Sequence, residues 1–93
     1  MTVQETLRAK LTAALKPTRL EIVDESHLHA GHAGARPEGE THFRIEIVSE
    51  AFTGQSRVAR QRLVYGIVAD ELRTRVHALA LSTRTPHEAA EPQ

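Results

Sequence analysis

The chain has 93 residues, of which 40% are hydrophobic and 26% charged, and its 12 basic and 12 acidic residues cancel. This length predicts one domain with a small core, and zero net charge argues against strong non-specific nucleic-acid binding. The absence of cysteine excludes disulfides, thiolate metal sites and thiol catalysis by this chain alone. No signal-peptide pattern and no long apolar run occurs, so we expect a cytoplasmic protein without a membrane segment.

The first helix is predicted over residues 2–16. Thr2 and Glu5 have the spacing of a capping box, in which each side chain bonds the backbone N–H of the other residue. Pro17 ends the helix. After the cap, apolar residues recur every three or four positions, as one face of an amphipathic helix requires: Val3, Leu7, Leu11, Ala14 and Leu15.

Two strands are predicted next, joined by a flexible loop. Residues 19–24 (RLEIVD) are rich in β-branched side chains, and residues 41–48 (THFRIEIV) alternate between apolar and polar. The glycines, proline and small residues of 30–40 predict the loop. We therefore expect an antiparallel pair. In its second strand Phe43, Ile45 and Ile47 should face inward, and His42, Arg44 and Glu46 outward.

The second half of the chain predicts a turn, a helix and a strand. Ser56 is a plausible N-cap for a helix that runs to about residue 73. Gly66 costs about 1 kcal/mol relative to Ala inside a helix, so a bend there would divide the segment into two helices. Residues 76–83 (VHALALST) predict a buried strand, and residues 87–93 a disordered tail.

This order of elements predicts an α+β domain of the type αββα(α)β over residues 1–86. A strand–helix–strand crossover favours a parallel pair with a right-handed connection. We therefore expect a three-stranded mixed sheet with helices packed on one face.

Three of the six histidines lie within ESHLHAGH, residues 25–32. Alternate residues of an extended chain point to the same side, so His27 and His29 can aim together, and Gly31 allows the loop to bring His32 near. Imidazole suits Zn, Cu, Ni and Fe, which makes these side chains candidate metal ligands. Polar loops also simply tolerate histidine, and the spacing alone does not decide.

His77 is a separate candidate. A period of two places it on the same face of its strand as Leu79 and Leu81. An imidazole there needs a partner for its nitrogens or an open edge. It is either a histidine at the edge of the core, bonded to a backbone carbonyl, or a metal ligand on a rigid element over which the loop histidines close.

Arg57, Arg60 and Arg62 lie on the first turns of the second helix, with Arg57 and Arg60 on one face. They form either a solvated face or a site for an anion, a protein partner or nucleic acid. The sequence has no Gly-rich phosphate loop with lysine, no serine elbow and no obvious pair of carboxylates. We therefore expect no enzyme.

Four segments occur in a familiar order: DES at 24–26 followed by the histidine-bearing loop, ETHF at 40–43, FTGQSRVARQRLVY at 52–65 and VHALAL at 76–81. In this combination the chain resembles the BolA family over roughly residues 3–86. Many members carry histidine between the arginines that correspond to Arg60 and Arg62, where this chain has Gln61.

The resemblance implies a KH-like fold of class II topology and a partnership with monothiol glutaredoxins. In those heterodimers a [2Fe–2S] cluster lies at the interface, with ligands from the glutaredoxin cysteine, from the cysteine of bound glutathione and from the BolA-like protein. The family's C-terminal histidine corresponds to His77. The loop ligand corresponds to His29, with His32 or His27 as alternatives.

We therefore expect a BolA-like adaptor that acts in iron–sulfur cluster trafficking or iron sensing and holds no cluster alone. Two imidazoles can replace two thiolates on one iron, as Rieske centres show. The alternative is a KH-like DNA-binding transcriptional regulator, which the three arginines and the family's reputation suggest. A third interpretation is an interaction domain whose histidines bind Zn or Cu adventitiously. The free protein is expected to be a monomer or a weak dimer.

Overall fold

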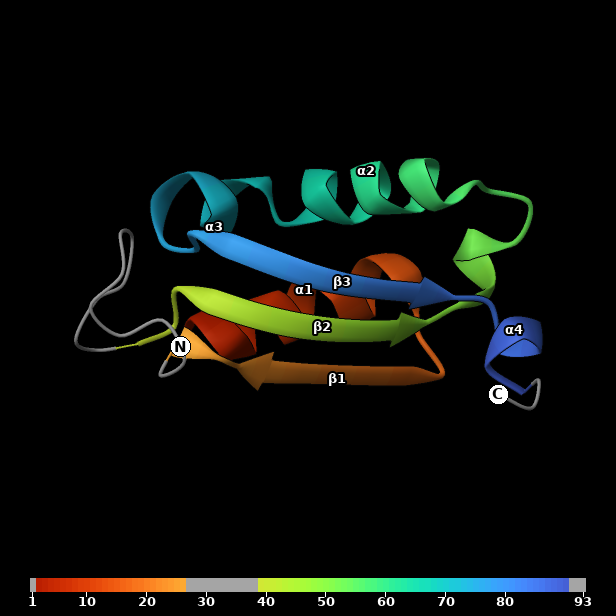
Figure 1. Ribbon diagram of the computed structural model, residues 1–93, viewed down its shortest axis with the longest axis horizontal. Helices are drawn as coiled ribbons and strands as arrows, with labels where there is room; N and C mark the ends of the chain where they lie inside the picture. The colour runs from red at the N-terminus through yellow and green to blue at the C-terminus, as the bar shows by residue number, and fades with distance from the viewer. Residues whose placement is uncertain (1, 27–38, 91–93) are drawn as a thin grey trace.

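The computed structural model describes residues 2–26 and 39–90, and Figure 1 shows how their elements are arranged. In chain order these are α1 (Val3–Leu15), β1 (Arg19–Asp24), β2 (His42–Val48), the 3₁₀ turn η2 (Glu50–Phe52), α2 (Arg57–Ile67), α3 (Ala69–Thr74), β3 (Ala78–Arg84) and α4 (Pro86–Ala90). The predicted αββα(α)β order is confirmed, with two further short helical segments after β2 and β3.

In the described part of the chain, three strands form one sheet of order β1–β2–β3. β1 pairs antiparallel with β2, which places Ile22 opposite Ile45, and β2 pairs parallel with β3, which places Ile45 opposite Leu81. The predicted mixed sheet is therefore confirmed. The helix pair α2–α3 provides the crossover that a parallel connection needs.

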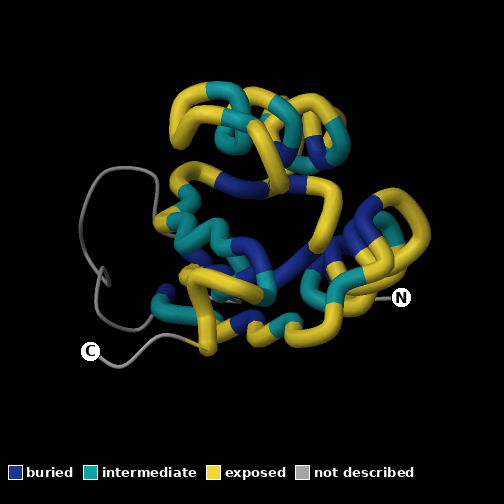
Figure 2. The backbone as a smooth tube through the Cα atoms, turned by 90° about the vertical axis from the view of Figure 1, so that its right-hand side faces the viewer, coloured by how far each residue is buried: buried dark blue, intermediate teal, exposed yellow. Residues whose placement is uncertain are grey.

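The core lies between one face of the sheet and the helices α1 and α2 (Figure 2). Alternate residues of β2 and one stripe of α1 point into it, as their periods of two and about four require. Its fully buried members include Leu7, Leu11, Ile45, Ile47, Phe52, Val64 and Val68. Among the described residues, Val23, Arg44 and Ala80 are exposed on the opposite face. The helices thus cover one side, as predicted.

α1 begins and ends as its sequence predicts. The Thr2 hydroxyl accepts from the Glu5 amide at 3.0 Å, and the Glu5 carboxylate accepts from the Thr2 amide at 2.8 Å. Lys16, just before Pro17, takes a left-handed conformation with φ 45° and closes the helix.

The second helix divides at Val68 rather than at Gly66. Gly66 remains inside α2, and Val68 has φ −108° and ψ 25°, with its side chain fully buried. Asp70 and Glu71 lie in the first turn of α3, where acidic groups favour a new helix N-terminus. The predicted division into two helices is correct, but its position is two residues later.

The predicted disorder after residue 86 is wrong for residues 87–90, which belong to α4. The Thr85 hydroxyl accepts from the Glu88 amide at 3.1 Å, and the Glu88 carboxylate accepts from the Thr85 amide at 2.8 Å. This second capping box begins α4, with Pro86 in the first helical position, which proline favours. Residues 91–93 lie outside the described residues. Within the described residues, no helix combines the length and apolarity needed to cross a membrane.

Candidate functional site

His77 lies immediately before β3, at the end of the sheet where β2 also begins. Its backbone N–H donates to the Thr41 carbonyl at 2.7 Å, and the Ala78 N–H donates to the same oxygen at 3.2 Å. Because two consecutive amides share one acceptor, the two-residue alternation is interrupted before β3. Val76 is therefore buried and His77 exposed, so the prediction that His77 shares the core-facing side with Leu79 is wrong.

His42 is a neighbour of His77 that sequence reasoning missed. The parallel register places His42 opposite Ala78, and the two imidazole centroids are 5.2 Å apart. His42 was expected to face outward, yet only 6% of it is exposed, since its ring packs against His77 and its Nδ1 lies 2.9 Å from the Thr41 hydroxyl. The strand pairing, which the sequence does not specify, is what brings the two rings together.

A network of hydrogen bonds ties the end of β1 to the start of β2 beside these histidines. The Ser26 hydroxyl oxygen accepts from the Thr41 amide at 2.9 Å and from the His42 amide at 3.2 Å. The Asp24 carboxylate accepts from the Ser26 amide at 2.9 Å and from the Glu40 amide at 3.1 Å. Both sides of the chain segment 27–38 are therefore anchored by the same few side chains.

The anchor extends to the N-terminus of α1 through Glu40. This residue has φ 61° and follows Gly39 with φ 75°, so the chain enters β2 through two left-handed residues. The Glu40 carboxylate accepts from the amides of Val3 and Gln4 at 3.2 and 3.1 Å. A carboxylate at this position satisfies free N–H groups of α1 and interacts favourably with the helix dipole.

His27, His29 and His32, the three candidates for the loop ligand, lie outside the described residues. The segment that contains them follows Ser26, which is hydrogen bonded to Thr41, and Thr41 also accepts from the His77 amide. Within residues 2–26 and 39–90, no three histidine, aspartate or glutamate side chains converge to hold a metal ion. A metal at His77 therefore requires further ligands from outside the described residues or from another molecule.

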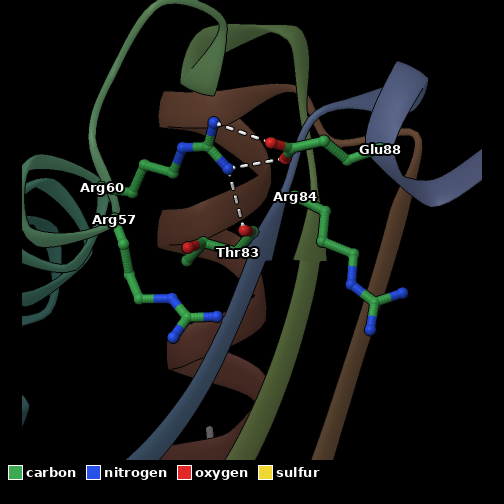
Figure 3. Close-up of a pocket in the computed structure, with 5 residues that line it drawn as sticks. All are labelled: Arg57, Arg60, Thr83, Arg84 and Glu88. Carbon is green, nitrogen blue, oxygen red and sulfur yellow. Dashed lines mark hydrogen bonds and ion pairs between the residues drawn. The ribbon is translucent and has the colours of Figure 1, made fainter.

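Arg60, a candidate for anion or partner binding, is held by groups of this chain (Figure 3). Its guanidinium donates to the Glu88 carboxylate at 2.7 Å and to the Thr83 carbonyl at 3.1 Å, and its Nε donates to the Gln55 carbonyl at 2.9 Å. The side chain is only 11% exposed. The hydrogen bonds from Arg60 and, second, from the Thr85 amide lower the pKa of Glu88 to about 2. Arg60 therefore docks α4 on the body of the domain.

Arg57 and Arg62, the other two candidates, are exposed but lie apart. Arg57 shares a cavity of about 340 Å³ with Arg60, as their common helix face suggested, whereas Arg62 is not among its lining residues. The cavity is completed by Thr83, Arg84 and Glu88. Sequence reasoning missed Arg84 and Glu88, although the Thr-x-x-Glu spacing of residues 85–88 is the same signal that identified the start of α1.

Comparison with known proteins identifies one family. A model of the family described as BolA-like protein matches residues 11–88. The chain is 46% identical over 88 residues to the "DNA-binding transcriptional regulator BolA" of Escherichia coli, covering 95% of this chain and 80% of that protein. It is 48% identical over 86 residues to "SufE-like protein 1, chloroplastic/mitochondrial" of Arabidopsis thaliana.

These relatives differ in how much of their own length the match covers. The match to the SufE-like protein covers 88% of this chain but only 23% of that protein. Among solved structures, BolA1 from Arabidopsis thaliana is 42% identical and superimposes with a TM-score of 0.86 over 99% of this chain and 98% of the other. The similarity thus extends over the whole fold described above.

Proposed function

This chain belongs to the BolA-like protein family, and on this basis we propose that it is an adaptor that binds a monothiol glutaredoxin. In the complex the two proteins share the coordination of a bridging [2Fe–2S] cluster, with glutathione as the carrier of a further thiolate. The protein acts in cluster trafficking or iron sensing and catalyses no reaction itself.

The observation that carries this proposal is the position of His77. Its imidazole is exposed, while its backbone is fixed by a 2.7 Å hydrogen bond to Thr41 at the head of β3. An exposed imidazole on a fixed backbone is available to an iron atom held by a second protein. A ligand on a rigid element also loses little conformational entropy when it coordinates.

The donor chemistry of the chain fits a shared cluster. Without cysteine the chain cannot supply thiolates, but neutral imidazole is a ligand for iron and for Rieske-type [2Fe–2S] centres. The thiolates would come from the glutaredoxin and from glutathione. Coordination requires the deprotonated nitrogen, so it weakens as the pH falls.

The second ligand is assigned to His29, with His27 and His32 as alternatives. All three lie outside the described residues, but covalent geometry limits their distance from Ser26: three residues span at most about 11 Å. Ser26 and His77 are both hydrogen bonded to Thr41. A ligand from the segment after Ser26 and a ligand from the head of β3 can therefore reach one iron atom.

The test is anaerobic reconstitution of the cluster with a monothiol glutaredoxin and glutathione, in the presence and absence of this protein. We expect this protein to change the visible absorption and circular dichroism of the cluster, and pulsed EPR of the reduced cluster to detect directly bound nitrogen. His77→Ala should remove one nitrogen coupling, and His29→Ala the other. His87→Ala is the matched control, because His87 is exposed in α4, at the opposite end of β3.

Two results would contradict the proposal. One is a cluster spectrum that does not change when this protein is added. The other is a changed spectrum that is identical for the wild type and His77→Ala. If His29→Ala has no effect but His32→Ala or His27→Ala removes a nitrogen, only the assignment of the loop ligand changes.

A second candidate function is DNA binding, which is favoured by the 46% identity to a relative named as a DNA-binding transcriptional regulator. The exposed Arg57 and Arg62 on α2 would contact phosphates. The zero net charge of the chain predicts weak non-specific affinity. An anisotropy titration of duplex DNA at several salt concentrations tests this candidate, and a flat response at low salt excludes it.

A further inference from the structure

We propose that the free edge of β3, near its C-terminal end, binds a short extended acidic segment of a partner protein by strand addition. The inference does not depend on the proposed cluster function. The surface lies near Arg84, at the end of β3 away from His77. Arg84 is six positions after Ala78 along β3, which corresponds to about 20 Å.

The first observation is that β3 is an edge strand. Among the described residues it pairs with β2 on one side and with no strand on the other. The Ala78 amide donates to the Thr41 carbonyl, and the Arg84 carbonyl accepts from the Ser49 amide. The backbone groups of these two residues therefore face β2. Since successive residues direct their backbone groups to alternate sides of a strand, Leu79, Leu81 and Thr83 direct theirs to the free edge.

The second observation is a cavity along this edge. It has a volume of about 300 Å³ and lies between the first turns of α2 and the second half of β3. It is lined by Arg57, Gln61, Leu81, Ser82, Thr83 and Arg84. Its volume is at the small end of the range for ligand pockets, which suits a short extended segment better than a folded element. The Thr83 carbonyl already accepts a hydrogen bond from Arg60, so this carbonyl is not available to a ligand.

The third observation is the charge on either side of the strand. Arg57 extends from α2 beside the edge of β3, while Arg84 extends from β3 over the open face of the sheet, so the two flank the strand (Figure 3). In the described part of the chain neither guanidinium forms a hydrogen bond or an ion pair. Both are therefore available to carboxylates of a ligand.

Strand addition explains why the two arginines lie on different sides. Consecutive side chains of an added strand point to opposite faces of the sheet. Two adjacent acidic residues of the ligand would therefore meet Arg57 on one face and Arg84 on the other. Backbone hydrogen bonds to the edge would supply affinity, and the two carboxylates would supply specificity.

The same region already holds a carboxylate of this chain. Glu88 accepts two hydrogen bonds from Arg60, at 2.7 and 3.3 Å, so an oxyanion is stable in the adjoining cavity. The three arginines that line this cavity outnumber its one glutamate. A peptide is favoured over nucleic acid as the ligand because only a peptide offers N–H and C=O groups that match a free strand edge.

The test uses a fluorescent six-residue peptide of β-branched residues with two adjacent glutamates at its centre, and measures binding by anisotropy. We expect Arg57→Ala and Arg84→Ala each to weaken binding about fivefold, as loss of an ion pair of about 1 kcal/mol predicts. Arg62→Ala is the matched control and should bind as the wild type does, because Arg62 is exposed on the same helix but does not line the cavity.

Two further peptides separate strand addition from simple charge attraction. Replacing the glutamates with lysines should abolish binding. Methylating the peptide's backbone nitrogens should also abolish it, although the charge is unchanged, and binding of the unmodified peptide should slow the hydrogen exchange of the Leu81 amide. Equal affinity for the methylated peptide would overturn the proposal. A lack of binding of the unmodified peptide would also overturn it, and binding of single-stranded DNA that depends on Arg57 and Arg84 would then assign the surface to nucleic acid.

Discussion

Replacing Ser26 with alanine tests whether one buried hydroxyl holds the two ends of the segment 27–38 together. Ser26 is 7% exposed, and the residues that donate to it, Thr41 and His42, are 1% and 6% exposed. Its oxygen accepts from both of their amides, at 2.9 and 3.2 Å. Ser26→Ala removes the hydroxyl oxygen that accepts from these two N–H groups, in a place that water reaches poorly.

The expected loss of stability follows from these two donors. Leaving one buried donor unsatisfied costs about 1–3 kcal/mol. Ser26 accepts from two such donors, one of them in a longer bond, which predicts a loss of about 2–4 kcal/mol for Ser26→Ala. For a domain of this size that corresponds to a fall in Tm on the order of 10–20 °C. It is also a large part of the 5–15 kcal/mol that stabilises a typical domain.

The assay is urea denaturation followed by far-ultraviolet circular dichroism, with the midpoint compared at unchanged m value. Ser82→Ala is the matched control, because Ser82 is half-buried on β3 and its hydroxyl makes no hydrogen bond within the described residues. It should lie within about 0.5 kcal/mol of the wild type. If Ser26→Ala were no more destabilising than Ser82→Ala, the hydroxyl would not be the anchor that its geometry indicates.

Three further changes have defined outcomes. Gly66→Ala should stabilise the domain by about 0.5–1 kcal/mol, because nothing lies within 4 Å of the added Cβ; a loss in thermal denaturation would contradict this. Glu40→Gln should cost about 1 kcal/mol by weakening the cap of α1, and an unchanged urea midpoint would refute it. The pKa of Glu88 is lowered from 4.5 to about 2 by the hydrogen bonds from Arg60 and, second, from the Thr85 amide, so its carboxylate stabilises the fold above pH 4.5 and this contribution is lost as the pH falls towards 2. The stability difference between the wild type and Glu88→Gln should therefore shrink over that interval, whereas a constant difference would show that the ion pair does not stabilise α4.

The elements that the sequence predicted well are those specified by local patterns. The capping box at Thr2 and the four-residue spacing of Leu7 and Leu11 define α1 to within one residue at each end. The alternation of residues 42–48 defines β2 in the same way. In each case the signal and the structure that it specifies lie within the same stretch of chain, so no tertiary contact is needed to place the element.

The sequence-based predictions were wrong where contacts between distant parts of the chain determine the structure. The exposure of His77 depends on Thr41, a residue 36 positions earlier, whose carbonyl accepts from two consecutive amides and interrupts the alternation. Residues 87–90 were expected to be disordered because they belong to the C-terminal tail, yet Arg60 binds Glu88 across the fold. In that second case a local signal existed, since Thr85 and Glu88 repeat the capping-box spacing, but the predicted disorder of the tail outweighed it.

Thr41 is hydrogen bonded both to the candidate ligand His77 and to Ser26. A variant that removes only the imidazole should therefore behave differently from a variant that disturbs Thr41. A ligand that binds only the folded form stabilises it in proportion to its occupancy. His77→Ala removes an exposed imidazole and should lower cluster binding while the stability of the free protein stays close to that of the wild type. Ser26→Ala breaks the bonds that hold Thr41 and should lower both quantities together. If His77→Ala destabilised the free protein as much as Ser26→Ala does, the imidazole would be a structural part of this end of the sheet and not a side chain available to a second molecule.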